Sequence, residues 1–480
     1  MVGVFLVGLG VFSTLLYQRF VLSADFATYN QAWTLIGQGH LDPLDTLRGF
    51  PFVRSQLELI MWPLALVHLV VHDSIVLLWI QDGAVAATGL VTYLWVLEYL
   101  EQQQVRPSSA IVIAAAVLLV MVVDAGAWLT VGFDFHMEPI ATCFLLLGAR
   151  ELWRGRHGRA FVFVAVVLLC GGFAAVMVIG LGVSALLAGA ATRRAGLLLV
   201  AAGLAWIGMI FLLHASEGSE LPHYAYLAGR TTLPAGGVVL IVKGIVSHPG
   251  RALHTIATRL PNIWKHLRGV GIVGVVSAWG FGVPVVVMAV TALDSHSNFS
   301  SSAFQNFAVL PFVLLGTVMV LVWAAEHLRW GRAAALVVGL LVLAEAVAYG
   351  CQQDPVTVRQ TLSVIPAGAV AALNNTLAKT PSDAEVVATL PINGRFSGRK
   401  YCYRVVPQLD LPVHARTVVF VFSTHHLELI SPAGLQRAIT YVRDDLHARV
   451  LADADGVWTF LWHPPAAMST VNVPTTAPAG

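Results

Sequence analysis

Charged residues are scarce in this sequence. Lysine, arginine, aspartate and glutamate together make up 11% of its 480 residues, whereas hydrophobic residues make up 57%. The mean hydropathy is +0.76. Soluble domains carry roughly 25% charged residues, so the composition excludes an ordinary soluble enzyme and predicts an integral membrane protein.

Cysteine is scarce as well, and basic clusters are missing. Four cysteines are too few for a disulfide scaffold or for a zinc site built from cysteines. The formal net charge is +2, and no basic stripe with interleaved aromatic residues occurs, so no nucleic acid is expected as a partner. Residues 2–20 lack the basic start and the small-residue cleavage site of a signal peptide, and we expect them to form the first membrane span.

Apolar runs are what the sequence has in plenty. A helix needs about 20 mostly apolar residues to cross the hydrocarbon layer of a membrane. About eleven runs are candidates, at residues 2–20, 75–97, 108–123, 137–150, 160–172, 175–191, 196–213, 267–281, 283–293, 305–325 and 333–349. We therefore predict a mainly α-helical, polytopic membrane bundle over residues 1–349.

Arginine positions predict the orientation of this bundle, because cytoplasmic loops carry an excess of Lys and Arg. Four short loops hold such residues, and the span list places all four on one side. They contain Arg106; Arg150, Arg154, Arg156 and Arg159; Arg193 and Arg194; and Arg329 and Arg332. We expect a multi-pass membrane protein with a cytoplasmic N-terminus. The outer side then holds loops 21–74, 124–136 and 214–266, and everything after about residue 350.

The first outer loop has helical signals of its own. Residues 24–36 (ADFATYNQAWTLI) have helical spacing of their aromatic and apolar side chains, with Ser23 as the expected N-cap. Residues 56–71 are also apolar, but Pro63 and His68 interrupt them. We predict that this second segment is a helix lying in the outer membrane interface rather than a span.

The composition changes after about residue 350, where the long apolar runs end. EVVATL and TVVFVF predict strands, LQRAITYVRDDLH predicts an amphipathic helix, and a hairpin is expected around Asp455-Gly456. We predict a small extracytoplasmic α/β domain at residues 350–463, followed by a flexible tail at 464–480.

Two cysteines lie in or next to this outer part. Cys351 and Cys402 are both placed where thiols can stay oxidised, so they could form a disulfide bond. The alternative is that both remain unpaired.

Three ionisable residues interrupt the apolar sequence at FDFHMEP, residues 133–139. Pro139 disfavours helical backbone at the residue before it. Asp134, His136 and Glu138 are therefore expected in an extended segment with their side chains on one face. They would then line the outer mouth of the bundle together. Two other interpretations stay open: a wet loop whose acids meet only water, and a metal site that other residues complete.

Two further acids are candidates for function. Asp25 follows the first span and opens the predicted helix, where an acid also stabilises a helix simply by complementing its dipole. Asp82 lies about 10 Å along the second span. A carboxylate at that depth costs at least ~2.5 kcal/mol and needs a partner or a cavity. Helix packing and function explain Asp82 equally well.

These segments together resemble the bacterial multi-pass membrane proteins grouped as DUF2079, which are related to the GT-C glycosyltransferases. The resemblance rests on DFATYNQAWTLIGQGH (25–40), FDFHMEPIA (133–141), SHPGRAL (247–253) and DAEVVATLPINGRFSGRKYCY (383–403). It implies a GT-C-like fold whose outer loops carry acids that take part in sugar transfer from a polyprenyl-phosphate donor. On this chain those acids are Asp25 and Asp134.

The resemblance also implies catalytic roles. Asp25 is the expected general base or acceptor-positioning acid. Asp134 and Glu138 are expected to orient the acceptor or to hold a divalent cation. The segment with His136 should face Asp25 across an outer-leaflet cavity, with the carboxylates within about 10 Å of each other.

Substrate-binding roles follow in the same way. His136 is expected to contact the donor phosphate together with Arg48 or Arg54, because a cation is needed near the leaving group. Gln31 belongs to the same matching segment as Asp25 and is expected to contact substrate. No metal ligand is assigned to any residue.

The chain departs from the family pattern at three places. CGGFA at 170–174, Gln305-Asn306, and RSQL at 54–57 stand where the family has an acidic cluster, a His-Tyr pair and a His-containing turn. These departures favour one alternative to the leading prediction of a membrane-embedded glycosyltransferase acting on an envelope acceptor. That alternative is a non-catalytic scaffold or accessory subunit of envelope glycan assembly. A transporter or lipid flippase is a second alternative, although no internal repeat is present.

Overall fold

The computed structural model covers residues 1–480. It describes all of them except 23, 214–220, 234–236, 268, 296–302, 391, 408, 426–429 and 477–480. The chain divides into two compact units. The bundle unit comprises Met1–Gly10, Val53–Ile60 and Ile80–Pro355, and the sheet unit comprises Val11–Phe52, Met61–Trp79 and Val356–Gly480. The helices α1 (Val2–Gln18), α5 (Ile75–Gln102) and α18 (Gly331–Ser363) pass from one unit to the other.

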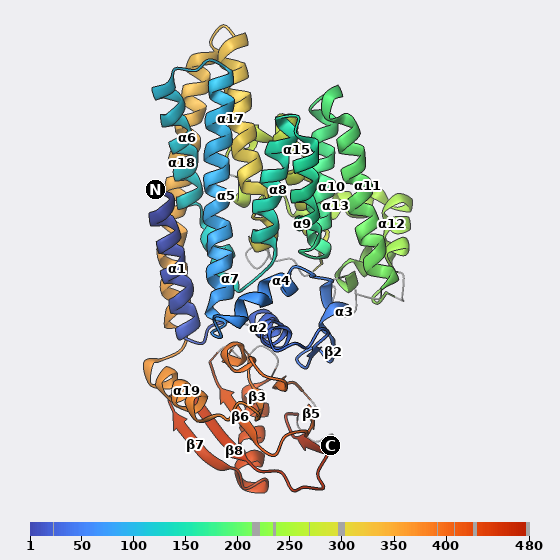
Figure 1. Ribbon diagram of the computed structural model, residues 1–480, viewed down its shortest axis with the longest axis vertical. Coiled ribbons are helices and arrows are strands. Elements are labelled where there is room, and N and C mark those ends of the chain that lie inside the picture. Colours follow the sequence, from blue (N-terminus) through green and yellow to red (C-terminus); the bar gives the residue numbers. More distant parts are fainter. Residues whose placement is uncertain are drawn as a thin grey trace. The chain divides into compact units, whose positions relative to one another are not determined.

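The bundle unit consists of helices, coloured from blue to yellow in Figure 1. In addition to α5 and α18 it contains α3 (Phe52–Gln56), α6 (Pro107–Val123), α7 (Ala125–Phe133), α8 (Glu138–Trp153), α9 (His157–Leu168), α10 (Gly172–Leu187), α11 (Ala190–Leu212), α12 (Gly237–Ser247), α13 (Pro249–Thr258), α14 (Leu260–Leu267), α15 (Ala278–Leu293), α16 (Ala303–Asn306), α17 (Val309–His327), and the 3₁₀ helices η2 (Leu221–Ala228) and η3 (Ile272–Val276). Helix α10 packs against α8, α11 and α15.

Several of these helices can cross a membrane. In the described part of the chain, four helices are long and apolar enough to do so, and the bent pair α6 and α7 makes a fifth if it counts as one span. Shorter apolar helices are α1, α9, α10, α12 and α15. The predicted fold class, a mainly helical bundle with several apolar spans, is confirmed, while the count of eleven spans stays a prediction.

Small residues let the helices approach closely. A Cβ atom on Gly180 of α10 would lie 2.7 Å from the Cα atom of Val283 and 3.0 Å from the carbonyl oxygen of Gly282, both in α15. The hydroxyl of Ser184 accepts a hydrogen bond of 3.0 Å from the backbone N–H of Gly282. Such small-residue interfaces are typical of membrane helices, where packing and hydrogen bonds rather than hydrophobic burial drive association.

Two predictions for the bundle were wrong in detail. Most of the loop predicted at 124–136 is helix α7, because the side chain of Asp124 accepts the N–H of Ala127 at 3.2 Å and so caps a new helix. The span predicted at 267–281 is not one helix. Gly271 has φ +79°, which breaks the run, and α15 begins only at Ala278.

The sheet unit is built around a five-stranded mixed sheet in the order β4-β3-β6-β8-β7 (Figure 1, orange to red). Strand β3 is parallel to β4 and β6, whereas β8 is antiparallel to β6 and β7. The strands are β3 (Glu385–Ala388), β4 (Cys402–Arg404), β6 (Val418–Ser423), β7 (Arg449–Ala454) and β8 (Val457–Trp462). Both predicted strands and the hairpin around Asp455-Gly456 are confirmed.

Alternating side chains bury both faces of this sheet. Val387 and Phe420 belong to the core that contains α20 (Pro432–Thr440), which confirms the predicted amphipathic helix. Val386 and Val419 point into a second core with α19 (Ala367–Lys379). This period of two is what a strand buried on both faces requires. The α/β domain is therefore a three-layer structure.

The N-terminal outer segments belong to the second core. Phe20 and Ala27 lie in it, and Ala27 is part of α2 (Ala24–Gly37). The guanidinium of Arg395 lies 4.7 Å from the ring centre of Tyr17 and 4.3 Å from that of Phe20. The predicted helix at 24–36 is confirmed, but it is buried on every side from 26 to 36. Its predicted cap, Ser23, lies outside the described residues.

The segment predicted as one interfacial helix at 56–71 is broken. It contains α4 (Met61–Ala65) and the 3₁₀ helix η1 (Leu66–Leu69). Pro63 lies in the first turn of α4 and prevents a continuous helix through the residues before it. Both pieces pack on α2. The indole N–H of Trp33 donates to the carbonyl of Leu64 at 3.3 Å, and the ring centre of Trp33 lies 4.5 Å from that of His68.

One prediction for the C-terminal part was also wrong, and the structure decides between the two alternatives left open for the cysteines. The tail predicted at 464–480 contains β9 (Thr470–Val473), which pairs antiparallel with β5 (Leu409–Pro412). The disulfide is absent: all four cysteines lie in the described part of the chain and are free. Cys351 is exposed, whereas burial raises the pKa of the Cys402 thiol to about 12, which leaves it without the thiolate that disulfide exchange requires.

A two-stranded ribbon completes the sheet unit near its N-terminal segments. Strands β1 (Leu44–Asp45) and β2 (Phe50–Pro51) pair antiparallel. The tight turn between them begins after Asp45 and holds Thr46 and Arg48, and this turn positions the first group of candidate residues.

Candidate functional site

The predicted site residues fall into two groups. Asp25, Gln31 and Arg48 belong to the sheet unit, whereas Asp134 and its neighbours, with Arg54, belong to the bundle unit. Each group is described in its own unit. That Asp25 and Asp134 face each other across one cavity stays a prediction.

In the sheet unit, one arginine connects two acids. Nη2 of Arg48 lies 3.2 Å from Oδ1 of Asp25, and Nε of Arg48 lies 3.8 Å from Oδ2 of Asp45. The side chains of Asp25 and Arg48 are 33% and 21% exposed, but that of Asp45 is 1% exposed. Solvent therefore reaches the Asp25–Arg48 pair, while the buried carboxylate of Asp45 holds the arginine on its interior side.

Asp45 is held by its surroundings. Its Oδ1 accepts the backbone N–H groups of Leu47 at 3.0 Å and Arg48 at 3.3 Å. Burial raises the pKa of Asp45 above its ordinary value; the charge of Arg48 and the two N–H groups act in the opposite direction. A buried carboxylate with these partners fixes the turn, which in turn fixes the direction of the Arg48 side chain.

Gln31 is part of the same framework. It is 1% exposed. Its Oε1 accepts the N–H of Thr46 at 2.9 Å, and its Nε2 donates to the Thr46 hydroxyl at 2.8 Å and to the carbonyl of Arg399 at 3.0 Å. The Thr46 hydroxyl donates to the carbonyl of Cys402. Gln31 thus connects α2 to the turn and to the segment before β4, and its amide is occupied by internal contacts rather than turned to a substrate.

In the bundle unit, the FDFHMEP segment is not an extended strand. Helix α7 ends at Phe133, and Asp134 follows with φ −177° and ψ −169°. Glu138 is already the first residue of α8, with Pro139 after it. The expectation that Pro139 forces Glu138 out of a helix was wrong, because proline is tolerated in the first turn, where N–H groups have no intrahelical partner.

A glutamine that the sequence did not single out holds this turn. Nε2 of Gln81 donates to the carbonyl of Asp134 at 2.8 Å, and Oε1 of Gln81 accepts the N–H of His136 at 2.6 Å. Gln81 is 0% exposed and belongs to α5. The signal was its place beside Asp82, in an otherwise apolar run.

His136 packs against two aromatic rings. Its ring centre lies 3.6 Å from that of Phe304, with 5° between the planes, and 5.5 Å from that of Phe133. Nδ1 of His136 lies 4.0 Å from Oε2 of Glu138. Phe304 belongs to α16, so the position next to Gln305-Asn306 contacts the turn directly.

The three residues of this turn are buried. Asp134, His136 and Glu138 are 0%, 5% and 8% exposed. Glu138 and the buried Glu58 both lie close enough to Cys170 to interact with it electrostatically. Two of the places where the chain departs from the family pattern therefore lie near the turn, at Cys170 and beside Gln305. Arg54, by contrast, is exposed on α3.

Chemically, the two groups differ. The Asp25–Arg48 pair offers a carboxylate that can accept a proton and a guanidinium that can neutralise an anion, both reached by solvent. The buried turn with Asp134, His136 and Glu138 contributes to the packing of the bundle unit and is closed to solvent. Among the described residues no group of three or more His, Cys, Asp or Glu side chains is arranged to hold a metal ion.

Comparison with known proteins agrees with the membrane fold. Residues 17–457 match the family described as a predicted membrane protein, DUF2079. This chain belongs to the DUF2079 family. The resemblance predicted from the four segments is confirmed, and this DUF2079 protein is a multi-pass membrane protein. A search of curated protein sequences finds no match.

Two solved structures similar to this DUF2079 protein are of ArnT from Cupriavidus metallidurans, one bound to undecaprenyl phosphate and one in the apo state. Each is 14% identical to it. The bound structure covers 95% of this chain and 97% of that chain, with a TM-score of 0.46. The apo structure covers 95% and 96%, with a TM-score of 0.49.

Proposed function

We propose that the protein transfers a sugar from a polyprenyl-phosphate donor to an envelope acceptor at the outer face of the plasma membrane. The observation that carries the proposal is the Asp25–Arg48 pair. It lies in the sheet unit directly after the apolar helix α1. A carboxylate and a guanidinium are therefore held together and are partly exposed to solvent, with the carboxylate close in sequence to the end of the first apolar helix.

The pair has the two groups that the reaction requires. The Asp25 carboxylate accepts the proton of an acceptor hydroxyl as its oxygen attacks the anomeric carbon. The bond from that carbon to the donor's phosphate oxygen breaks, and the phosphate leaves with the electron pair. Arg48 neutralises the charge that develops on the phosphate. Asp45 keeps Arg48 in place while Asp25 engages the acceptor.

A second candidate is a non-catalytic scaffold in envelope glycan assembly. The observation that favours it is the burial of Asp134, His136 and Glu138. Gln81 holds the backbone of the turn, and the ring of Phe304 stacks on His136. Residues first assigned to the acceptor and the donor thus have internal roles. In the transferase proposal, Asp134 and Glu138 belong to the buried turn between α7 and α8 and do not touch substrate.

The Asp25→Asn variant tests the proposal, because it removes charge and keeps shape. We expect transfer of a labelled sugar from lipid-linked donors in isolated membranes to fall by about 10²-fold or more. Arg48→Gln should lower it as well. Asp445→Asn, which changes an exposed acid in the same unit, is the matched control and should leave transfer unchanged.

Folding is followed in parallel by the yield and melting temperature of each purified variant. A folded Asp25→Asn protein with undiminished transfer would overturn the proposal. Envelope assembly that needs the protein but tolerates Asp25→Asn would make the scaffold the first choice.

A further inference from the structure

The bundle unit contains a long segment with cations and no acid. Between residues 221 and 267 the sequence has no aspartate or glutamate, although the whole chain is nearly balanced with 28 basic and 26 acidic residues. The cations are Arg230, Lys243, Arg251, Arg259 and Lys265, and His223, His248, His254 and His266 accompany them. The segment forms η2 and the helices α12, α13 and α14.

Helix α12 exposes a stripe of valines. Val239, Val242 and Val246 are 72%, 54% and 75% exposed, and their spacing places them on one face of the helix. The opposite face is packed, with Ile241 in a core with Leu227. The exposed Lys243 lies beside the valine stripe, where a lysine can bury its stem along apolar surface and keep its charge in the polar layer.

Helices α13 and α14 continue the pattern. Each carries cations or histidines on one side and apolar residues on the other. Leu253 of α13 and Leu260 and Trp264 of α14 are exposed. Tryptophan is enriched where a membrane meets water. Short amphipathic helices with cations and exposed Leu or Trp are typical of segments that lie in a bilayer interface.

Two of the cations stabilise the segment itself. Arg251 donates to the carbonyls of Tyr226 at 2.9 Å and Leu227 at 3.3 Å. Arg259 donates to the carbonyl of Asp294 and, at 3.4 Å, to that of Ser295. Arg230 and Lys243 are exposed, so these two cations can reach a partner.

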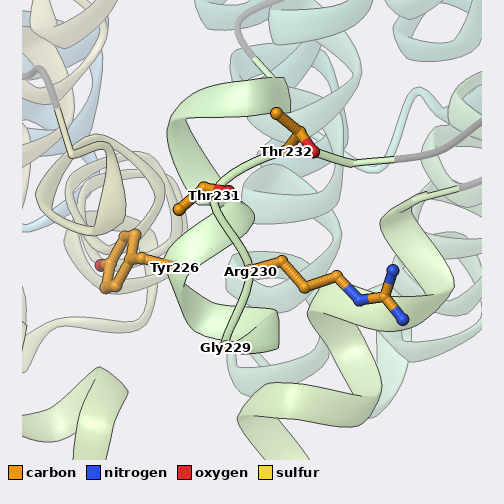
Figure 2. A pocket seen from close by; sticks show the side chains of 5 residues that line it. All are labelled: Tyr226, Gly229, Arg230, Thr231 and Thr232. Carbon is orange, nitrogen blue, oxygen red and sulfur yellow. The ribbon is translucent and has the colours of Figure 1, made fainter.

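An open hollow lies where η2 turns towards α12. Tyr226, Gly229, Arg230, Thr231 and Thr232 line it. Figure 2 shows that Arg230 extends away from Tyr226 and that the two threonines do not point to the same place. The side chains do not converge on a small ligand, so the hollow is better explained as part of a broad surface than as an enclosed pocket.

We infer that η2 and α12–α14 form a docking surface for anionic phospholipid headgroups of the bilayer. Arg230 and Lys243 contact the phosphates, and the valine stripe with Leu253 and Trp264 enters the boundary of the acyl chains. Charge complementarity favours anionic headgroups as the partner, because an uncharged lipid surface would leave the positive charges of Arg230 and Lys243 without counter-charges. The inference is independent of sugar transfer and of Asp25.

The test uses the full-length protein reconstituted in vesicles. Val246→Cys is labelled with a fluorophore in a Cys351→Ser background, since the other three cysteines are buried. Val450→Cys, an exposed valine on β7, is the matched control. Lipids with a quencher at a shallow acyl position report contact, in phosphatidylcholine alone and with increasing phosphatidylglycerol.

We expect quenching at position 246 to rise with phosphatidylglycerol and to weaken at high salt, with no quenching at position 450. Arg230→Gln with Lys243→Gln should weaken the affinity of this surface for the bilayer by about fivefold for each charge removed. A larger fraction of phosphatidylglycerol is then needed to reach the same quenching at position 246. Arg416→Gln with Arg449→Gln, which removes the same charge from the sheet unit, should leave the quenching at position 246 unchanged. The inference is overturned if quenching at 246 matches that at 450. It is also overturned if quenching at 246 does not depend on lipid charge, or if Arg230→Gln with Lys243→Gln leaves it unchanged.

Discussion

Oε1 of Gln81 accepts a hydrogen bond of 2.6 Å from the backbone N–H of His136. With the bond from Nε2 of Gln81 to the carbonyl of Asp134, the side chain of a helix completes the backbone bonding of a buried turn. Buried N–H and C=O groups are costly when they lack partners. Gln81 therefore allows the chain to bend between α7 and α8 inside the bundle unit.

Gln81→Leu should destabilise the protein, because it keeps side-chain size and removes both bonds. Each buried backbone group left without its partner costs about 1–3 kcal/mol. We expect a clear drop in melting temperature in detergent. Gln103→Leu, at an exposed position beyond the end of α5, is the control. Equal melting temperatures for the two variants would show that Gln81 does not hold the turn.

Gly180→Ala should force α10 and α15 apart. The added Cβ would lie 2.7 Å from the Cα atom of Val283, and backbone cannot yield as a side-chain tip can. Overpacking of this kind costs about 1–3 kcal/mol. Gly208→Ala on α11 meets nothing within 4 Å and should be neutral or stabilising by up to about 1 kcal/mol. Thermal unfolding of both variants checks the prediction, which fails if Gly180→Ala melts no lower than Gly208→Ala.

Local patterns of the sequence were enough to predict much of the fold. Apolar runs predicted most helices of the bundle, and alternation predicted β3 and β6. The hairpin was predictable because Asp455 and Gly456 both adopt positive φ, at 47° and 79°, as a tight turn of this kind requires. Helix α7 was missed, although Asp124 before an apolar run is an N-cap signal that could have identified it.

What the sequence could not predict depends on distant partners. Strand β9 forms because residues 470–473 pair with 409–412, and neither run is apolar or long enough to be recognised alone. Gln31 seemed a substrate ligand because it stands near Asp25, but its partners lie at Thr46 and Arg399. The candidate pair shows the same limit: Asp25 was predictable, whereas the choice of Arg48 over Arg54 depends on the turn that Asp45 fixes.

Glu385→Gln should remove a pH dependence of the stability of the sheet unit. Glu385 is buried on β3, and its Oε1 accepts the N–H groups of His414 and Ala415 at 2.6 and 3.1 Å. Burial raises the pKa of Glu385 above its ordinary value of 4.5, against the effect of these N–H groups and of His414. A raised folded pKa gives stability that is fully present below the unfolded value and is lost as pH rises through the folded value.

The measurement is the alkylation rate of the buried Cys402, which reports opening of the same sheet. The ratio of rates in the wild type and in Glu385→Gln, taken at each pH, cancels the titration of the thiol. We expect this ratio to grow as pH rises above 4.5, because only the wild type must bury a charge. A ratio that stays constant across this range contradicts the assignment.

Cys351 can test the orientation on which the outer-face proposal rests. It is exposed near the end of the apolar part of α18, and the other three cysteines are buried. A membrane-impermeant maleimide should label it from outside when the plasma membrane is intact, with or without reductant, and Cys351→Ser should abolish the label. Arg194→Cys in that background, at an exposed position in a loop predicted to be cytoplasmic, should be labelled only after permeabilisation. The opposite pattern would place α2 and Asp25 on the cytoplasmic side. The Asp25–Arg48 pair would then face the cytoplasm, and transfer at the outer face would be ruled out even if the pair proved essential.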